Sequence, residues 1–252
     1  MLDYTALTPV GATVTGLRVG ALDQQSVLDM RFVLAEHGFV VLPGQDAGDD
    51  EFVRFLRSFG AMMFTVGETP VPGHPDLNVV SNVGRVTPPR STFHTDTSYV
   101  RNPSAYTALR AVEVPQFGGH TLFTNQYSAY ATLPARVRDQ LADRTITHVM
   151  TGLDLDDDHE TSAVHPIFLV DPLSRRTALY LSTPQRCADV SDMSPRLVAY
   201  LFEHSTRESN VYRHTWSPGD VVMWDNRCVL HCADHAGVVG DRIMHRGMVA
   251  AG

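Results

Sequence analysis

The sequence has little cysteine, no long apolar run and no excess of basic residues, and each shortage removes a class of protein. Its three cysteines are an odd number among 252 residues, and no two form a Cys-x-x-Cys pair. Neither a disulfide framework nor a thiolate zinc site is therefore expected. No stretch approaches the ~20 apolar residues that cross a bilayer. Lysine and arginine total 20 against 28 aspartates and glutamates, which disfavours a nucleic-acid binder because phosphate neutralisation needs clustered cations.

The chain begins MLDYTALTPV, without the charged and apolar regions of a secretory signal peptide. Together with reduced cysteines, this start predicts a cytoplasmic protein. The net charge of −8 does not oppose an anionic substrate, because a basic pocket can lie inside an acidic protein. We expect a small-molecule substrate, no nucleic acid and no membrane as partners, and the sequence leaves a homo-oligomer open.

Apolar residues make up 43% of the chain and charged residues 19%, the balance of a globular protein, and we expect one domain over 1–252. In the N-terminal part, 21–60, apolar spacing predicts a helix over 23–36, a buried strand over 39–42 and a second helix over 49–59. We expect this helix-strand-helix unit to pack on the rest of the domain.

Short strands dominate the remainder of the chain. The candidates are 77–83, 105–114, 120–124, 167–170, 177–181 and 220–224. Turn residues at 171–174 should join two of them as a hairpin, and 195–208 should form one more helix. Many strands with few helices predict an α+β, mainly β protein, built as a β-sandwich or jelly roll. The segments 61–92 and 151–166 are interpreted as lid-like insertions, because long loops in compact domains are uncommon and often functional.

His94 and Asp96 form a His-x-Asp motif. In an extended segment, residues i and i+2 point to the same side, so an imidazole and a carboxylate would project together. They would supply two ligands of a two-histidine, one-carboxylate face, which leaves positions open on iron(II). A motif this short matches often by chance, and the third ligand must come from elsewhere in the chain.

Three further blocks follow this motif in order. They are Gly118-Gly119-His120-Thr121-Leu122-Phe123, then Trp224-Asp225-Asn226-Arg227-Cys228-Val229-Leu230-His231, then Arg242-Ile243-Met244-His245-Arg246. Over roughly residues 30 to 249, this combination resembles the taurine/2-oxoglutarate dioxygenase family, which includes the 2,4-dichlorophenoxyacetate oxygenases. His120 differs from the family pattern, which more often has Asp there. The expected fold class is then a double-stranded β-helix (jelly roll) core with flanking helices.

The resemblance implies a non-haem Fe(II) enzyme that uses 2-oxoglutarate and O2 as co-substrates. His94, Asp96 and His231 would be the metal ligands and the catalytic centre. Thr121 and Arg242 would bind the distal carboxylate of 2-oxoglutarate. A planar guanidinium forks onto a carboxylate and a threonine hydroxyl can add a hydrogen bond. Decarboxylation of 2-oxoglutarate to succinate would be coupled to hydroxylation, or a related C–H oxidation, of the substrate.

Four residues are candidates for binding that substrate. Arg90 lies four residues before the first ligand and Tyr99 three residues after Asp96. Arg246 would lie near the co-substrate or the substrate, and Phe64 would give an apolar wall. Together they favour a small substrate that is anionic or resembles an amino acid.

Two other functional classes stay open. A metal-dependent jelly-roll hydrolase or isomerase would keep the metal triad but has no need for Arg242 beside Thr121. A non-catalytic binding domain on the same scaffold has no chemical reason to keep both the metal triad and the carboxylate clamp, the pair of Thr121 and Arg242.

Overall fold

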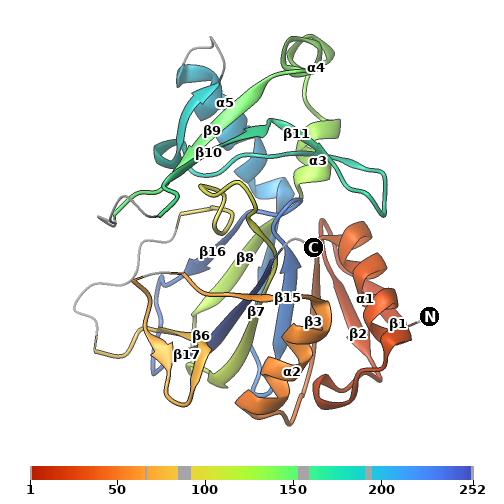
Figure 1. Ribbon diagram of the computed structural model, residues 1–252, viewed down its shortest axis with the longest axis vertical. Helices are drawn as coiled ribbons and strands as arrows, with labels where there is room; N and C mark the ends of the chain where they lie inside the picture. Colours follow the sequence, from red (N-terminus) through yellow and green to blue (C-terminus); the bar gives the residue numbers. More distant parts are fainter. Residues whose placement is uncertain (1, 66, 85–91, 153–158, 191–194, 251–252) are drawn as a thin grey trace.

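The computed structural model describes residues 2–65, 67–84, 92–152, 159–190 and 195–250 (Figure 1). Its helices are α1 (Gln24–His37), α2 (Asp49–Phe59), α3 (Gln126–Ala131), α4 (Ala135–Leu141) and α5 (Pro195–Thr206), with the 3-10 turns η1 (Val19–Ala21), η2 (Pro184–Arg186) and η3 (Glu208–Asn210). None of the described helices is long and apolar enough to span a membrane.

One large sheet runs through the lower part of the molecule (Figure 1). Its path is β1 (Asp3–Ala6), β2 (Ala12–Thr15), β3 (Phe39–Leu42), β15 (Val221–Asp225), β7 (Ser104–Glu113), β17 (Ile243–Ala250), β6 (His74–Ser81) and β5 (Pro70–Val71), with β4 (Met62–Met63) also paired to β17. The β2–β3 pair is parallel, whereas β3–β15, β15–β7 and β7–β17 are antiparallel.

Three smaller sheets complete the described strands. They are β14 (Val211–His214), β8 (His120–Thr124) and β16 (His231–Asp234); β10 (Ser162–Pro166), β9 (Thr145–Val149) and β13 (Cys187–Val190); and the hairpin β11 (Phe168–Val170) with β12 (Thr177–Leu179). The predicted hairpin is confirmed, because the Asp171 side chain accepts bonds from the Leu173 and Ser174 amides in the turn between β11 and β12.

The large sheet has an apolar layer on each face. On one face, α1 and α2 pack over strand residues, and α2 contributes Phe52, Phe55, Leu56 and Phe59. On the other face, a second cluster joins the large sheet to β14-β8-β16; Phe39 of β3 stacks on Phe123 of β8 with ring centroids 4.2 Å apart. A third cluster lies among α3, α5, β9 and β12, in the upper part of Figure 1. The chain is thus mainly β with a few helices.

The structure refines two sequence-based expectations. The helix-strand-helix unit exists, but β3 is a member of the large sheet, between β2 and β15. The segment 61–92, interpreted as a lid-like insertion, contains β4, β5 and β6, because β4 and β6 pair with β17 and β5 pairs with β6. Within 151–166 the structure has β10. Residues 85–91 and 153–158 lie outside the described part.

His148 on β9 is a buried histidine whose ring nitrogens have no hydrogen-bond partner among the described residues. It stacks on Tyr180, with ring centroids 5.2 Å apart, and burial lowers its pKa from 6.5 to about 3. Below pH 6.5, His148 is therefore protonated in the unfolded chain but stays neutral in the folded chain. His148 alone should therefore cost about 2 kcal/mol of unfolding free energy between pH 7 and pH 5, since one pKa unit corresponds to ~1.4 kcal/mol.

This loss is measured by urea unfolding of the metal-free wild type and of the metal-free His148→Phe variant, each at pH 7 and at pH 5. The variant keeps the stacked ring and should lose about 2 kcal/mol less than the wild type on acidification. An equal loss in the two proteins would show that His148 is not the group that titrates.

Candidate metal and co-substrate site

His94 and His231 lie opposite each other in a short antiparallel bridge. The His94 amide donates to the His231 carbonyl over 3.0 Å, and the His231 amide donates back over 2.9 Å. Residues directly opposite in such a pair project to the same side, and the two ring centroids are 4.4 Å apart. The bridge thus brings together two residues that are far apart in the sequence.

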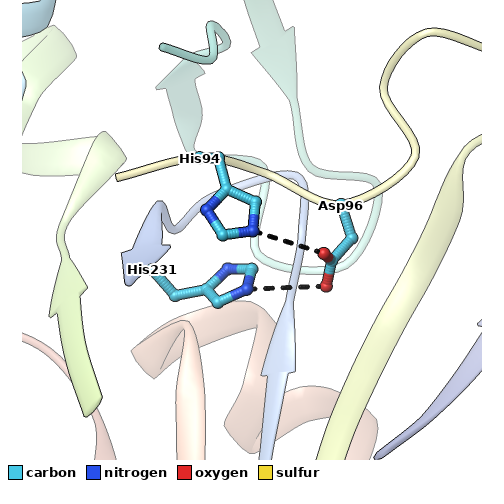
Figure 2. Close-up of side chains that lie close together, drawn as sticks. All are labelled: His94, Asp96 and His231. Atoms are coloured by element: carbon cyan, nitrogen blue, oxygen red, sulfur yellow. Dashed lines mark ion pairs between the residues drawn. The ribbon is translucent and has the colours of Figure 1, made fainter. Parts of the chain in front are cut away.

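Asp96 completes the group, as Figure 2 shows. Its Oδ1 lies 3.7 Å from His94 Nε2 and its Oδ2 lies 3.6 Å from His231 Nε2. One ligand atom from each of the three residues lies within 4.8 Å of the others. His94 is part of a single bridge rather than a strand, and Asp96 begins a turn in which Thr97 has a φ of 49°. The local conformation differs from the predicted extended one, but the three side chains do converge.

The donor set suits a divalent transition metal. His94 Nδ1 bonds to the Thr92 carbonyl over 2.9 Å, so its proton is held there and the Nε2 lone pair faces Asp96. Burial lowers the pKa of His94 and lowers that of His231 to about 3, which keeps both imidazoles neutral. Burial opposes ionisation of Asp96, but the charge of Arg246 and of the two histidines in their protonated forms outweighs it and holds the pKa of Asp96 below the ordinary value. Two neutral imidazoles and one carboxylate are the ligand set of non-haem iron(II).

A chain of hydrogen bonds fixes the Asp96 carboxylate. The Thr107 hydroxyl donates to Asp96 Oδ2 over 2.8 Å and accepts from Asn226 Nδ2 over 2.8 Å. The Trp224 indole donates to Asn226 Oδ1 over 3.0 Å. Every member of this chain is buried. Thr107 was not found from the sequence, because an ordinary strand threonine carries no local signal that an aspartate lies beside it.

The second predicted pair, Thr121 and Arg242, also forms. Arg242 is 1% exposed, and its Nη2 donates to Thr121 Oγ1 over 3.3 Å while its Nε donates to the Gly119 carbonyl over 2.9 Å. Its Nη1 has no partner among the described residues, and burial lowers its pKa to about 10. Among the residues that the structure describes, no carboxylate contributes to that pKa. A buried guanidinium without a counter-ion is costly, so the arrangement suits an anionic ligand.

Two neighbours hold Arg242 in this position. Its backbone amide donates to Asn82 Oδ1 over 2.7 Å, and the Asn82 amide donates to the Arg242 carbonyl over 3.2 Å. Gly119 has a φ of +67°, and a Cβ there would lie 3.0 Å from Arg242 Cδ and 2.8 Å from Pro115 Cγ. The second glycine of the Gly-Gly turn is therefore needed for the close approach of the arginine stem.

The strand register gives the spacing between the two groups. Phe123 lies opposite His231, and Thr121 lies opposite Ala233. Thr121 and His231 therefore project from the same face of the β8–β16 pair, two residues or ~7 Å apart along the strands. A short dicarboxylate can span that distance, with one end at the metal ligands and the other at Arg242.

A cavity of about 110 Å³ opens beside the metal ligands. It is lined by Thr65, Glu68, His94, Asp96, Thr97, Tyr99, Met150, Thr151, Arg186 and Arg246. Two of the predicted substrate residues, Tyr99 and Arg246, are therefore at the cavity. Phe64 is 37% exposed and does not line it. Arg90 lies outside the described residues.

Two charged residues of the cavity were missed by the sequence analysis. Glu68 Oε1 lies 3.2 Å from Arg246 Nη2, and Arg246 Nη1 lies 3.9 Å from Asp96 Oδ1. Arg186 reaches the cavity from η2 and bonds Thr151 Oγ1 over 3.4 Å. Neither Glu68 nor Arg186 belongs to a recognisable motif, and only the folded chain brings them to the metal ligands.

The chain is similar in sequence and in fold to a family of known dioxygenases. The profile of the family described as "Taurine catabolism dioxygenase TauD, TfdA family" matches residues 3–248. Pentalenolactone F synthase of Streptomyces arenae is 30% identical, over 94% of this chain and 91% of that protein. The alpha-ketoglutarate-dependent 2,4-dichlorophenoxyacetate dioxygenase of Cupriavidus pinatubonensis is also 30% identical, over 84% of each chain. The crystal structure of a taurine dioxygenase from Burkholderia xenovorans superposes with a TM-score of 0.86 at 28% identity, over 100% of this chain and 91% of that one.

Proposed function

The chain belongs to the TauD/TfdA family of 2-oxoglutarate-dependent dioxygenases, and from that premise we propose that His94, Asp96 and His231 bind its iron(II) while Thr121 and Arg242 bind its 2-oxoglutarate. The observation that carries this assignment is the buried Arg242, which has no counter-ion among the described residues and bonds Thr121, a residue on the same face of the β8–β16 pair as His231. A hydrolase or an isomerase would have no use for it.

Iron(II) and 2-oxoglutarate together supply dioxygen activation, coupling decarboxylation of the co-substrate to oxidation of a substrate C–H bond. The residues of the chain hold and orient the reactants. The His94 and His231 lone pairs face one point, and the Thr107 hydroxyl keeps Asp96 aimed at it. Arg242 and Thr121 would fix the far carboxylate, so that the keto-acid end reaches the metal ligands in one orientation. Asp96, His231, Thr121 and Arg242 are buried, which limits the access of water to this part of the site.

We propose a small substrate that carries an anionic group, or one that resembles an amino acid, bound in the cavity by Tyr99 and Arg246. Arg246 supports this proposal because its guanidinium lies 3.9 Å from the Asp96 carboxylate and already pairs with a carboxylate of the chain, that of Glu68. Relatives named for 2,4-dichlorophenoxyacetate and (S)-phenoxypropionate act on carboxylates. Arg90 and Phe64 remain predicted contributors.

A matched panel of compounds tests the proposed substrate class. Small carboxylates, with 2,4-dichlorophenoxyacetate among them, are each paired with the corresponding neutral amide, and succinate formation is measured above the substrate-free rate. The carboxylates should stimulate the reaction and the amides should not. Equal stimulation by the amides would refute the anionic-substrate proposal and leave the enzyme class intact.

We further propose that the large sheet and β14-β8-β16, which enclose one apolar cluster, form a double-stranded β-helix core in a single domain. The segments 61–92 and 151–166 would act as lids, because each contributes residues to the cavity wall. The three cysteines are buried free thiols, which supports a reducing, cytoplasmic setting.

A further inference from the structure

The Thr121 hydroxyl receives two donors in the folded protein. The Trp216 indole Nε1–H donates to Thr121 Oγ1 over 3.0 Å, and Arg242 Nη2–H donates to the same oxygen over 3.3 Å. Neither nitrogen can accept a hydrogen bond. A hydroxyl has two lone pairs and one hydrogen, so both lone pairs are occupied. The Thr121 hydrogen is left to donate to a ligand.

Trp216 is held so that this bond persists. It is 5% exposed and Thr121 is 2% exposed. His214 of β14 pairs with Thr121 of β8, and Trp216 follows two residues after the end of β14. The His214 ring packs edge-on against the indole with centroids 4.7 Å apart, and its Nε2 lies 3.3 Å from Asp220 Oδ2.

The indole also faces the arginine of the clamp. The Arg242 guanidinium carbon lies 5.8 Å from the Trp216 ring centroid, within the range of a cation–π contact. A single side chain therefore touches both proposed ligands of the distal carboxylate. Trp216 belongs to none of the sequence blocks that predicted the site, and it precedes a Ser-Pro-Gly run that carries no functional signal.

We propose that Trp216 is a positioning residue of the 2-oxoglutarate site. Its indole N–H occupies a lone pair of the Thr121 hydroxyl, so that this hydroxyl acts as a donor. Thr121 and Arg242 then bind a distal group that accepts hydrogen bonds and donates none. This inference rests on the proposed binding of 2-oxoglutarate by Thr121 and Arg242. A carboxylate accepts from both Thr121 and Arg242. An amide at the same position would direct N–H hydrogens at a hydroxyl whose lone pairs are already occupied.

The test is calorimetric titration of 2-oxoglutarate into the protein holding Mn(II), which occupies the metal ligands without turnover. Trp216→Phe should weaken 2-oxoglutarate binding about tenfold, the scale of one hydrogen bond to a charged site, and leave Mn(II) affinity unchanged. Unchanged Mn(II) affinity also shows that the variant is folded. In iron-dependent turnover, KM for 2-oxoglutarate should rise with little change in kcat.

A double-mutant cycle shows whether Trp216 acts through Thr121. Thr121→Val removes the hydroxyl, and adding Trp216→Phe to it should cost no further affinity beyond about twofold. Additive losses would overturn the proposal. Trp216→Leu, which also lacks the N–H, should bind 2-oxoglutarate at least as weakly as Trp216→Phe. A loss of 2-oxoglutarate affinity in Trp216→Leu but not in Trp216→Phe would indicate a packing role for Trp216 and would also overturn the proposal.

Discrimination against the distal amide, 2-oxoglutaramate, is the second readout. The wild type should prefer 2-oxoglutarate strongly, and Trp216→Phe should narrow that preference several-fold because a Thr121 lone pair is released. An unchanged preference would contradict the proposal. If the wild type binds Mn(II) but not 2-oxoglutarate, the proposed function fails at the clamp and this inference fails with it, whereas a failure confined to the Trp216 variants leaves the proposed function standing.

Discussion

Replacing His231 with alanine should abolish 2-oxoglutarate turnover and weaken iron(II) binding by more than ~100-fold, since losing even an outer partner of a ligand costs 10- to 100-fold. The variant removes one of three ligands whose donor atoms lie within 4.8 Å of one another. No other described residue belongs to a group of metal-ligating side chains, so no replacement ligand is at hand. Anaerobic iron titration and succinate formation measure the two losses.

Two further variants calibrate this result. Thr107→Val keeps all three ligands but removes the hydroxyl that donates to Asp96, and iron affinity should fall by about 10- to 100-fold. His120→Ala removes another histidine of the same strand pair, one whose Nδ1 bonds the Thr215 hydroxyl and which is not in the metal-ligating group, and iron affinity should not change. Retention of wild-type iron binding by His231→Ala would refute the assigned ligand set.

Replacing Arg242 with methionine should weaken 2-oxoglutarate binding by about two to three orders of magnitude. Truncating one partner of a buried, hydrogen-bonded charge pair costs roughly 2–5 kcal/mol, and the unpaired Nη1 shows which donor the ligand would lose. Arg242→Lys should recover only part of the affinity, because an ammonium cannot form the planar fork. Iron affinity without the co-substrate should stay close to that of the wild type.

The same variant separates binding from stability. In the described part of the chain the buried Arg242 charge has no counter-ion, so Arg242→Met should leave the unfolding free energy of the ligand-free protein unchanged or raise it by about 1 kcal/mol. Arg213→Ala is the matched control, because that arginine pairs with Asp234 on the exposed side of the neighbouring strand, and 2-oxoglutarate affinity should not change. A strongly destabilised Arg242→Met with normal 2-oxoglutarate affinity would mean that the arginine is structural.

Elements with a strong local pattern were predictable from the sequence. Strands β3 and β8 and helix α2 have the predicted bounds, because each couples a clear apolar pattern with turn or capping residues. Strands β16 and β17 were not identified. β16 is a short segment, His231–Asp234, and β17 contains His245, Arg246 and Gly247. Pairing with β8, β7 and β6 makes them strands, and such pairing is a property of the whole fold.

The residues of the candidate site likewise fall into those that the sequence predicts and those that only the fold brings together. The triad and the Thr121–Arg242 pair could be predicted, because four ordered blocks of sequence carry them. The residues that position these groups could not be predicted. Asn226 and Trp216 act through bonds to residues far along the chain, and Thr107 bonds Asp96 only because the chain turns back between them. The role of Glu68 and Arg186 in the cavity wall depends on how their loops fold over the ligands.

The most direct test of the account is anaerobic titration of the metal-free protein with iron(II) and then 2-oxoglutarate, followed through the weak visible charge-transfer band of the chelate. The wild type should develop the band, His231→Ala should not, and Arg242→Met should require far more 2-oxoglutarate. Iron binding without a band in the wild type would contradict the proposed co-substrate site. A wild type that binds neither iron nor 2-oxoglutarate would contradict the assignment of both sites.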